Sequence, residues 1–416
     1  MGRSRVGRKD ITVDLIILGG GVAGLWTLNR ALRAGYDAIL LEKDKLGGGQ
    51  TIRAQGIIHG GMKYAMEGVL TKVSNIIRDM PALWRTSLAG SGEIDLRGVT
   101  VLSNAHYLWS NRSLGGRVAA FFASHALRDR IAPVPVEDRP DAFRDKGFRG
   151  AVYRLNELVL DVGSLTERLA EPVLPRIFRA EPEDYTLETR AGKVTGLTFP
   201  AHGLTLRPRH MALCCGEGYE AFARRYFGAA PSRWGPFHGP LPRMQRRPLH
   251  MVMVKRHTLP PLYAHYLSGG PRPLVTLTTH YAKDSGAIWY LGGELAESGT
   301  KRDGAGQIEK AKSTLHELLP WVDLGGARWA TLRVDRAEPR QGTLTLPDRA
   351  FAEGHGNLIV AWPTKLALAP DLAGKVMAHL APAGGDAPPA PAPELAVLPR
   401  PAIAEAAWEG AFGPEV

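Results

Sequence analysis

The first forty residues alternate between two hydrophobic patterns. Residues 11–18 are mostly apolar and rich in β-branched side chains, which is typical of a buried parallel strand. Within residues 22–34, Leu25, Leu28 and Leu32 recur at helical spacing, and residues 38–41 form a second short apolar strand. This order of strand, helix and strand predicts a βαβ unit and therefore a parallel sheet.

The pattern changes along the rest of the chain. Up to residue 218 we expect helices at 70–88, 115–127 and 164–173, with strands at 99–109, near Ile177, near Thr195 and at 211–215. The strand-like runs 249–254, 274–280 and 287–291 then predict an antiparallel sheet, because Asp284-Ser285-Gly286 is a hairpin signal between the last two. A helix at 308–318, a strand at 358–361 and a helix at 367–380 follow, and the Ala/Pro-rich segment after residue 381 is expected to be an exposed or polyproline-like tail.

Composition limits the class of protein without defining it. The chain has 416 residues and 44% hydrophobic content, enough for two or three domains. The net charge of +11 allows an anionic partner, although a diffuse positive surface with a basic N-terminus is the simpler interpretation. No apolar stretch is long enough to span a membrane. The two cysteines, Cys214 and Cys215, are adjacent, so we expect neither disulfides nor a metal site, and a location in the cytoplasm, either free or at the membrane surface.

A glycine motif lies between the first strand and the first helix. Gly19-Gly20-Gly21-Val22-Ala23-Gly24 matches G-x-G-x-x-G, and Glu42 ends the next strand. In such a motif the first glycine permits a tight turn, the second allows a diphosphate to approach the backbone, and the third allows close helix–strand packing. The helix N-terminus offers N–H groups to the phosphates, and Glu42 is suited to ribose hydroxyls. The motif predicts a dinucleotide cofactor.

The following segment favours FAD over NAD. Residues 47–61 are again rich in glycine and polar groups. A domain for NAD has no need of such a segment directly after its acidic residue, whereas the longer FAD requires polar groups and close backbone approach further along the chain.

The residues from Gly19 to Gly61 resemble the D-amino-acid-oxidase-like superfamily of FAD-dependent oxidoreductases. Within it, Ile58-His59-Gly60-Gly61-Met62-Lys63-Tyr64 is most similar to the FAD-dependent glycerol-3-phosphate dehydrogenase branch, where an Ile-His-Gly-Gly stretch follows the flavin loop. The chain departs from that branch at Gln50–Gln55, where small hydroxyl residues are usual.

Two later segments carry the same resemblance. Residues 357–366 occupy the place of the family's closing strand, turn and helix, where Lys365-Leu366 matches and Trp362-Pro363-Thr364 replaces the usual glycines. Cys215-Gly216-Glu217-Gly218 resembles the middle strand and turn that close over the cofactor. The match is clear over about 100 residues and faint in the rest. The departures from the family pattern bear on the identity of the substrate more than on the binding of FAD.

The resemblance implies an α/β fold with a discontinuous, Rossmann-like FAD-binding domain and a substrate domain built on a mixed or antiparallel sheet. We expect the first domain to comprise residues 1–85, 149–235 and 339–382, the second residues 86–148 and 236–338, and the tail residues 383–416. We expect FAD to contact residues of the glycine motif, the flavin loop and the closing turn: Gly19, Gly21, Val22, Ala23, Gly24, Glu42, Lys43, Gln50, Thr51, Gln55, Gly56, Ile57, Gly216, Thr364, Lys365 and Leu366.

Three residues are candidates for catalysis. His59 is the best candidate for a base, because an imidazole titrates near neutral pH, although it could instead only hydrogen-bond the flavin loop. Lys365 can place positive charge near the flavin, unless it is a solvated surface lysine. Arg333, in a segment where related enzymes hold an anionic group, is the favoured partner of a substrate carboxylate or phosphate.

Three more residues are candidates for substrate binding. Arg336 follows Arg333 but could pair with Asp335 or Glu338 instead. Tyr290 and His280 lie on the predicted antiparallel strands that form a wall of the pocket in the superfamily, with core packing as the alternative for both. Trp289 is expected to face opposite to Tyr290.

These features predict oxidation of a CH–OH or CH–NH group of a small, anionic substrate by hydride transfer to the flavin, with oxygen, a quinone or a carrier protein as electron acceptor. An FAD enzyme acting on a modified tRNA base is an alternative suggested by the basic charge, but no basic stripe interleaved with aromatic residues supports it. A non-catalytic dinucleotide-binding module is a second alternative, which His59 and Lys365 argue against.

Overall fold

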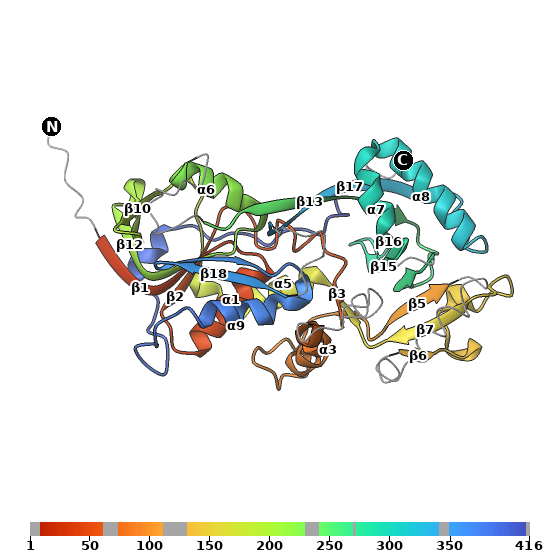
Figure 1. Ribbon diagram of the computed structural model, residues 1–416, viewed down its shortest axis with the longest axis horizontal. Coiled ribbons are helices and arrows are strands. Elements are labelled where there is room, and N and C mark those ends of the chain that lie inside the picture. The colour runs from red at the N-terminus through yellow and green to blue at the C-terminus, as the bar shows by residue number, and fades with distance from the viewer. Residues whose placement is uncertain are drawn as a thin grey trace.

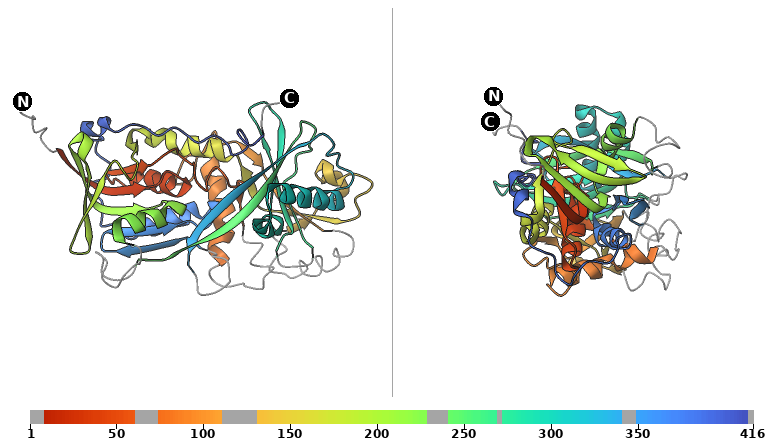
Figure 2. Two further views of the ribbon diagram at one scale, coloured as in Figure 1. Left: turned by 90° about the horizontal axis from the view of Figure 1, so that it is seen from above. Right: turned by 90° about the vertical axis from the view of Figure 1, so that its left-hand side faces the viewer.

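The computed structural model describes residues 9–60, 74–110, 131–228, 241–268, 272–340 and 349–412. Residues 61–64 of the family resemblance, the expected helix at 115–127 and the first residues of the expected helix at 70–88 lie outside these ranges. Figures 1 and 2 show an elongated molecule with one large sheet toward each end.

The first sheet has eight strands, and its centre is parallel. β1 (Lys9–Leu18) lies between β12 (Leu204–Leu213) and β2 (Ala38–Glu42), and β2 pairs with β9 (Ile177–Arg179). On its other side β12 pairs with β11 (Lys193–Phe199), which pairs with β10 (Thr186–Arg190), and with β19 (Leu358–Trp362), which pairs with β18 (Phe351–His355). The strands come from the start, middle and end of the chain, as expected.

Both faces of this sheet are covered, because its strands are apolar on both sides. Leu15 and Ile17 of β1 join the apolar cluster that holds α1 (Val22–Arg33), α5 (Val162–Ala170) and α9 (Ala369–Met377). Ile16 and Leu18 point to the opposite cluster, which includes α6 (Tyr219–Phe227). This alternation explains why the run 11–18 lacks a polar face.

The second sheet also has eight strands, in the order β17-β13-β16-β15-β14-β5-β7-β6. Every neighbouring pair is antiparallel except β14 with β5, so the sheet is mixed. The expected hairpin joins β15 to β16, with Ser285 in the left-handed region at φ 62°. The bounds of the strands are β5 His106–Ser110, β6 Ile131–Pro133, β7 Ala151–Leu155, β13 Met244–Lys255, β14 Ala264–Tyr266, β15 Val275–Tyr281, β16 Ala287–Gly292 and β17 Arg328–Pro339.

Two structures join the sheets. β13 and β17 pair along their whole lengths and extend from the first sheet to the second (Figure 1). A small sheet of β3 (Ile57–Ile58), β8 (Leu158–Leu160) and β4 (Val101–Ser103) lies between them. The described residues also form the helices α3 (Ser74–Leu88), α7 (Glu294–Ser298) and α8 (Gly304–Leu318).

Some elements differ from the sequence-based expectation. The run 99–109 is divided between β4 and β5, which belong to different sheets, and Ser103 caps the break by bonding the N–H and C=O of Ala105. β17 covers the segment of Arg333 and Arg336, to which the sequence assigned no strand. Within the described ranges no helix combines the length and the apolar character needed to cross a membrane.

The prediction that the C-terminal segment is an exposed tail is wrong. Leu395 and Leu398 are buried in the apolar cluster of the first sheet, and Ile403 forms a β-bridge with Leu46. Trp408, further on, is buried in the second sheet, with its ring 4.5 Å from that of His280. Figure 2 shows this segment in dark blue, extending along the molecule. Large apolar residues recur among the alanines and prolines of this segment, and their burial explains why it packs on the fold.

Candidate active site

The glycine turn connects β1 to α1 in a conformation that side chains would block. Gly19 has φ of 107°, and a Cβ there would lie 2.5 Å from the carbonyl oxygen of Cys214. A Cβ on Gly24 would lie 1.9 Å from the carbonyl oxygen of Gly19, so only glycine allows the helix to pack this close to the turn. α1 therefore begins at Val22 with its N-terminus directed over the end of β1.

Two polar side chains hold the turn from outside. Glu42, at the end of β2, accepts a hydrogen bond from the N–H of Gly20 at 2.5 Å and another from the N–H of Asp44 at 3.0 Å. Thr51 accepts one from the N–H of Val22 at 3.0 Å. The loop after β2 is thereby fixed against the start of the helix.

A cavity of about 640 Å³ runs from this turn toward the second sheet. It is lined by nearly all the residues expected to contact FAD: Gly19, Gly21, Val22, Ala23, Glu42, Lys43, Gln50, Thr51, Gln55, Gly56, Ile57, Gly216, Thr364, Lys365 and Leu366. Gly24 is not part of the lining, because it packs beneath the turn.

The residues at this end of the cavity fit FAD. Glycine backbone without Cβ atoms, a helix N-terminus and an acidic residue at the end of β2 provide for a diphosphate and a ribose. Gly216, with φ of 53°, brings the backbone after β12 to the same wall. The segment 47–56 lies between the turn and the second sheet, where the rest of a long cofactor would extend.

The flavin-loop segment is anchored on the second sheet by Gln55. Its side-chain amide donates to the carbonyl oxygens of Tyr290 at 2.9 Å and Thr276 at 3.2 Å. The hydroxyl of Tyr290 donates in turn to the carbonyl oxygen of Arg53 at 3.0 Å. Tyr290 is fully buried and contacts the loop from outside the cavity lining. Its position matches the core-packing alternative.

His280 is also a core residue. It is completely buried, its Nε2 lies 2.9 Å from the hydroxyl of Thr278, and its ring packs on Trp408. Burial lowers its pKa to about 3, so the ring is neutral. Trp289 joins a different apolar cluster from Tyr290, as the expected alternation requires.

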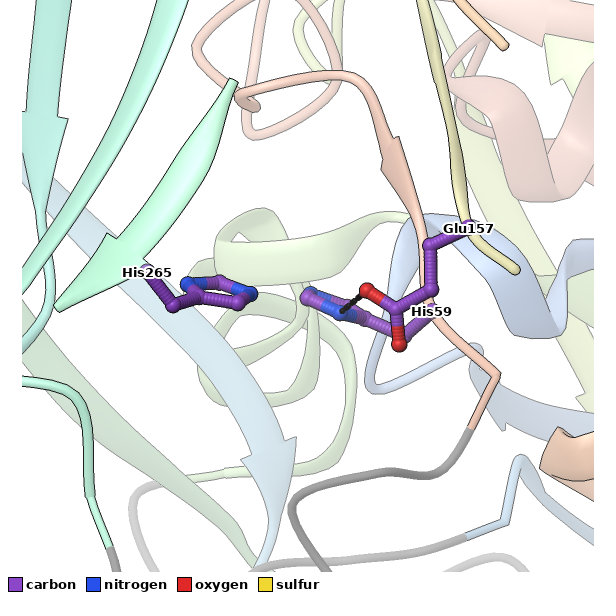
Figure 3. Close-up of side chains that lie close together, drawn as sticks. All are labelled: His59, Glu157 and His265. Atoms are coloured by element: carbon purple, nitrogen blue, oxygen red, sulfur yellow. Dashed lines mark hydrogen bonds and ion pairs between the residues drawn. The ribbon is translucent and has the colours of Figure 1, made fainter. Parts of the chain in front are cut away.

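His59 lies at the other end of the cavity, beside a buried carboxylate. Its Nδ1 is 3.3 Å from Oε2 of Glu157, whose Oε1 accepts from the N–H of Gly60 at 2.9 Å (Figure 3). Burial raises the pKa of Glu157, but His59, His265 and the Gly60 N–H outweigh it and hold that pKa below its ordinary value. The carboxylate is therefore ionised next to His59.

Arginines and glutamates form the wall contributed by the second sheet. Arg336 and Arg272 both line the cavity and both approach Glu297, at 3.8 and 3.3 Å. Burial lowers the pKa of Arg336 and raises that of Glu338, with the two groups opposing each other's shift. Asp335, the other partner considered for Arg336, pairs with Arg246 instead, at 3.0 Å.

Arg333 does not line the cavity. Its guanidinium donates to the carbonyl oxygens of Arg302 at 2.6 Å and Thr300 at 3.2 Å, and its side chain is exposed. Arg336, three residues later, lies in the cavity lining. The spacing of three along a strand places the two side chains on opposite faces of β17, which the sequence alone could not orient.

Lys365 lines the cavity at the closing turn, next to Thr364 at φ 63°. It precedes the short 3₁₀ turn Leu366–Leu368 that leads into α9, and its charge opposes the rise that burial causes in the pKa of Glu338. Sequence reasoning missed several ionisable residues of the lining: Glu157, His265, Arg272 and Glu297. None belongs to a local motif, and their proximity to His59 and Arg336 depends on strand pairing.

A two-sheet α/β fold with a dinucleotide-binding turn facing a charged pocket defines a flavoprotein oxidoreductase class. A family model described as FAD dependent oxidoreductase (DAO) matches residues 14–366. The chain belongs to the DAO family of FAD-dependent oxidoreductases, and it is an enzyme with FAD as its cofactor. The prediction of family, fold class and cofactor is confirmed, and a non-catalytic module is not favoured.

The chain is similar over its whole length to the Probable FAD-dependent oxidoreductase PA4991 of Pseudomonas aeruginosa. The two are 50% identical over 405 residues, which cover 97% of this chain and 99% of the relative. The crystal structure of that protein superimposes with a TM-score of 0.79 at 45% identity, over 97% of this chain and 99% of that one. Glycine oxidase from Geobacillus kaustophilus, at 15% identity, covers 89% of this chain and 94% of its own with a TM-score of 0.61, which shows the shared fold alone.

The glycerol-3-phosphate dehydrogenase branch has weaker support. A glycerol-3-phosphate dehydrogenase of Synechocystis is 31% identical over 79 residues, which are 19% of this chain and 14% of that enzyme. Membership of the family is therefore established, and the branch stays a prediction.

Proposed function

We propose that this enzyme oxidises a CH–OH or CH–NH group of a small anionic substrate, as a cytoplasmic FAD-dependent dehydrogenase or oxidase. The observation that carries the proposal is the cavity of about 640 Å³, which reaches without interruption from the dinucleotide turn to a wall of paired charges. When bound, FAD supplies the hydride acceptor at its N5 atom. We propose that the predicted glycine-turn, flavin-loop and closing-turn residues that line the cavity hold it.

The charged wall supports an anionic substrate. Arg336 and Arg272 face the same space, and a guanidinium binds a carboxylate or phosphate through paired N–H donors. Glu297 lies between them and keeps the arginines oriented. Of the two arginines predicted on β17, Arg336 is therefore the one we propose for the substrate.

His59 is the proposed proton acceptor. Oxidation of an alcohol or amine requires removal of the O–H or N–H proton as the hydride leaves carbon. Glu157 fixes the His59 ring through Nδ1, which leaves Nε2 as the atom to take the proton, and its negative charge stabilises the imidazolium that results. Lys365 contributes positive charge to the cavity, where the reduced cofactor would gain negative charge.

The proposal does not choose between CH–OH and CH–NH substrates. The partial match to a glycerol-3-phosphate dehydrogenase favours an alcohol, whereas the structural likeness to proteins named glycine oxidase and L-amino acid deaminase comes at identities that carry fold alone. A modified tRNA base is not favoured. The unpaired thiols of Cys214 and Cys215 support a reducing compartment.

Anaerobic reduction tests the proposal. The purified holoenzyme is mixed with hydroxy acids, amino acids and glycerol 3-phosphate, each paired with its uncharged amide or alcohol analogue, and flavin absorption is followed. We expect an anionic member of one class to bleach the flavin and its uncharged analogue to react far more slowly. Equal rates for a charged compound and its analogue, or no bleaching by any member, would overturn the substrate class.

A further inference from the structure

Three potential metal ligands meet at the substrate end of the cavity. His59 follows β3, Glu157 lies between β7 and β8, and His265 is on β14, so each comes from a different part of the chain. One ligand atom of each lies within 4.8 Å of those of the other two. Figure 3 shows the ring edge of His265 directed toward His59, while Glu157 approaches His59 from the other side.

The distances are close to those of a coordination site. Bonds of about 2.0–2.1 Å in a tetrahedral zinc site place neighbouring ligand atoms about 3.4 Å apart. His59 Nδ1 and Glu157 Oε2 are already 3.3 Å apart. The remaining separations, at most 4.8 Å, require His265 to approach by about 1.4 Å or less, which side-chain rotation provides.

The surroundings hold these side chains in place. Glu157 has only 4% of its side chain exposed, and its second oxygen accepts the Gly60 N–H. His265 Nδ1 lies 2.9 Å from the hydroxyl of Thr276, a contact that orients the ring, as outer partners do for metal-binding histidines. The site thus combines one carboxylate with two imidazoles, a set of oxygen and nitrogen donors that suits a transition-metal cation.

A third histidine gives an independent indication. His106 is completely buried, its ring lies 4.1 Å from that of His265, and neither ring nitrogen has a hydrogen-bond partner in the part of the chain described. The wall behind His265 therefore carries a buried imidazole without a hydrogen-bond partner, which is available as an outer partner of a bound cation.

We propose that His59, Glu157 and His265 form a binding site for a divalent transition-metal cation of the Zn²⁺ class. Imidazole nitrogens suit Zn²⁺ and its neighbours in the first transition series, whereas Mg²⁺ and Ca²⁺ prefer sites made of oxygen atoms alone. A cation bound at Nδ1 of His59 would leave the ring proton on Nε2, the atom that the proposed oxidation needs as proton acceptor, so the metal would inhibit turnover. This inhibitory consequence rests on the proposed function, whereas the binding itself does not.

Metal binding is measured on the holoenzyme without any substrate. Chelator-treated, dialysed protein is titrated calorimetrically with ZnCl₂, and separately with MgCl₂. We expect one equivalent of Zn²⁺ to bind and Mg²⁺ to bind far more weakly. The variants His265→Ala and Glu157→Gln are each expected to weaken Zn²⁺ binding at least about tenfold. His316→Ala, at an exposed histidine of α8, is the matched control and should bind as the parent protein does.

Spectroscopy separates loss of the site from loss of the fold. Co²⁺ bound by nitrogen and oxygen ligands gives visible ligand-field bands, which should develop in the parent protein and be lost in His265→Ala while its flavin absorption stays normal. His265 is partly exposed, so this variant keeps the test valid even if Glu157→Gln unfolds. Absence of stoichiometric Zn²⁺ binding to the parent, or undiminished binding in His265→Ala, would overturn the site. Because no turnover is measured, either result is independent of whether a substrate is found.

Discussion

The two ends of the cavity are lined by different parts of the protein: backbone at one end and side chains at the other. At the first sheet the lining is backbone and glycine, and its shape follows from a turn in which Gly19 and Gly24 leave no room for a side chain. At the second sheet the lining is charged side chains, such as Arg336, Arg272 and Glu297, held by contacts between distant parts of the chain. A cofactor end made of backbone tolerates only glycine at key positions, whereas a substrate end made of side chains can change specificity by single substitutions.

The difference also concerns how each end is supported. The glycine turn lies within one βαβ unit, while the flavin loop is held on the second sheet by the bonds of Gln55 and Tyr290. The C-terminal segment adds a further connection between the two large sheets, because it packs on the first sheet at Leu395 and on the second at Trp408. The two regions are thus coupled by elements outside both motifs.

Weakening the contact of the C-terminal segment with the second sheet is expected to have the largest effect on stability. Trp408→Ala deletes a buried indole that packs on His280 and Tyr290, and such a deletion costs about 4 kcal/mol. Urea unfolding followed by tryptophan and flavin fluorescence would measure it. Val397→Ala, in the same segment at an exposed position, should change stability by less than about 0.5 kcal/mol. Equal stability of the two variants would mean that the segment does not hold the halves together.

The glycine turn should be the next most sensitive position. Gly24→Ala places a Cβ 1.9 Å from the carbonyl oxygen of Gly19, and the resulting overpacking should cost about 3 kcal/mol and reduce the bound FAD. The ratio of flavin to protein absorption and the thermal midpoint report the two effects. Gly384→Ala is the control, since nothing lies within 4 Å of a Cβ there. If the Gly24→Ala protein bound a full equivalent of FAD and were as stable as the parent, the turn would not require a glycine at this position.

The two arginines of β17 are expected to differ in their effect on substrate binding. Arg336→Ala should raise KM for the anionic substrate by about 10- to 100-fold, because a charge-assisted hydrogen bond contributes about 2–3 kcal/mol. Arg333→Ala should raise it far less, since that side chain bonds carbonyl oxygens outside the cavity. Steady-state kinetics with the substrate found in the anaerobic panel would decide. The reverse ranking would return the substrate role to Arg333.

The smallest expected effect is a pH dependence that comes from the second sheet. Burial lowers the folded-state pKa of His280 to about 3. As the pH falls, the unfolded chain therefore takes up a proton at this ring at a higher pH than the folded protein does. The stability it contributes is present above the unfolded pKa of about 6.5 and is lost as pH falls toward 3, which amounts to about 2 kcal/mol between about pH 7 and pH 5.

The variant His280→Gln should remove that part of the acid-side loss. Unfolding free energies of both proteins at several pH values would show a shallower slope for the variant. His316→Gln, at an exposed histidine, should keep the parent slope. If His280→Gln also kept the parent slope, the ring would not be neutral in the fold.

Local patterns predicted the parts of this protein whose contacts are local. The run 11–18, the glycine turn, the helix from Val22 and Glu42 lie within one βαβ unit, so their spacing was enough to identify a dinucleotide-binding turn. The hairpin at 284–286 was also predicted, because its turn residues and both strands are adjacent in the chain. The discontinuous architecture came from the family resemblance.

Only the tertiary structure decided the rest. Which face of β17 carries Arg336 depends on its pairing with β13, and the proximity of Glu157 and His265 to His59 depends on three separate strand positions. The packing of the C-terminal segment likewise depends on apolar surfaces that the rest of the fold creates, since Leu395 and Trp408 are buried in clusters whose other members come mostly from distant parts of the chain. Spacing along the chain fixes geometry within one turn, helix or hairpin, whereas contacts between distant segments arise only when the whole sheet has formed.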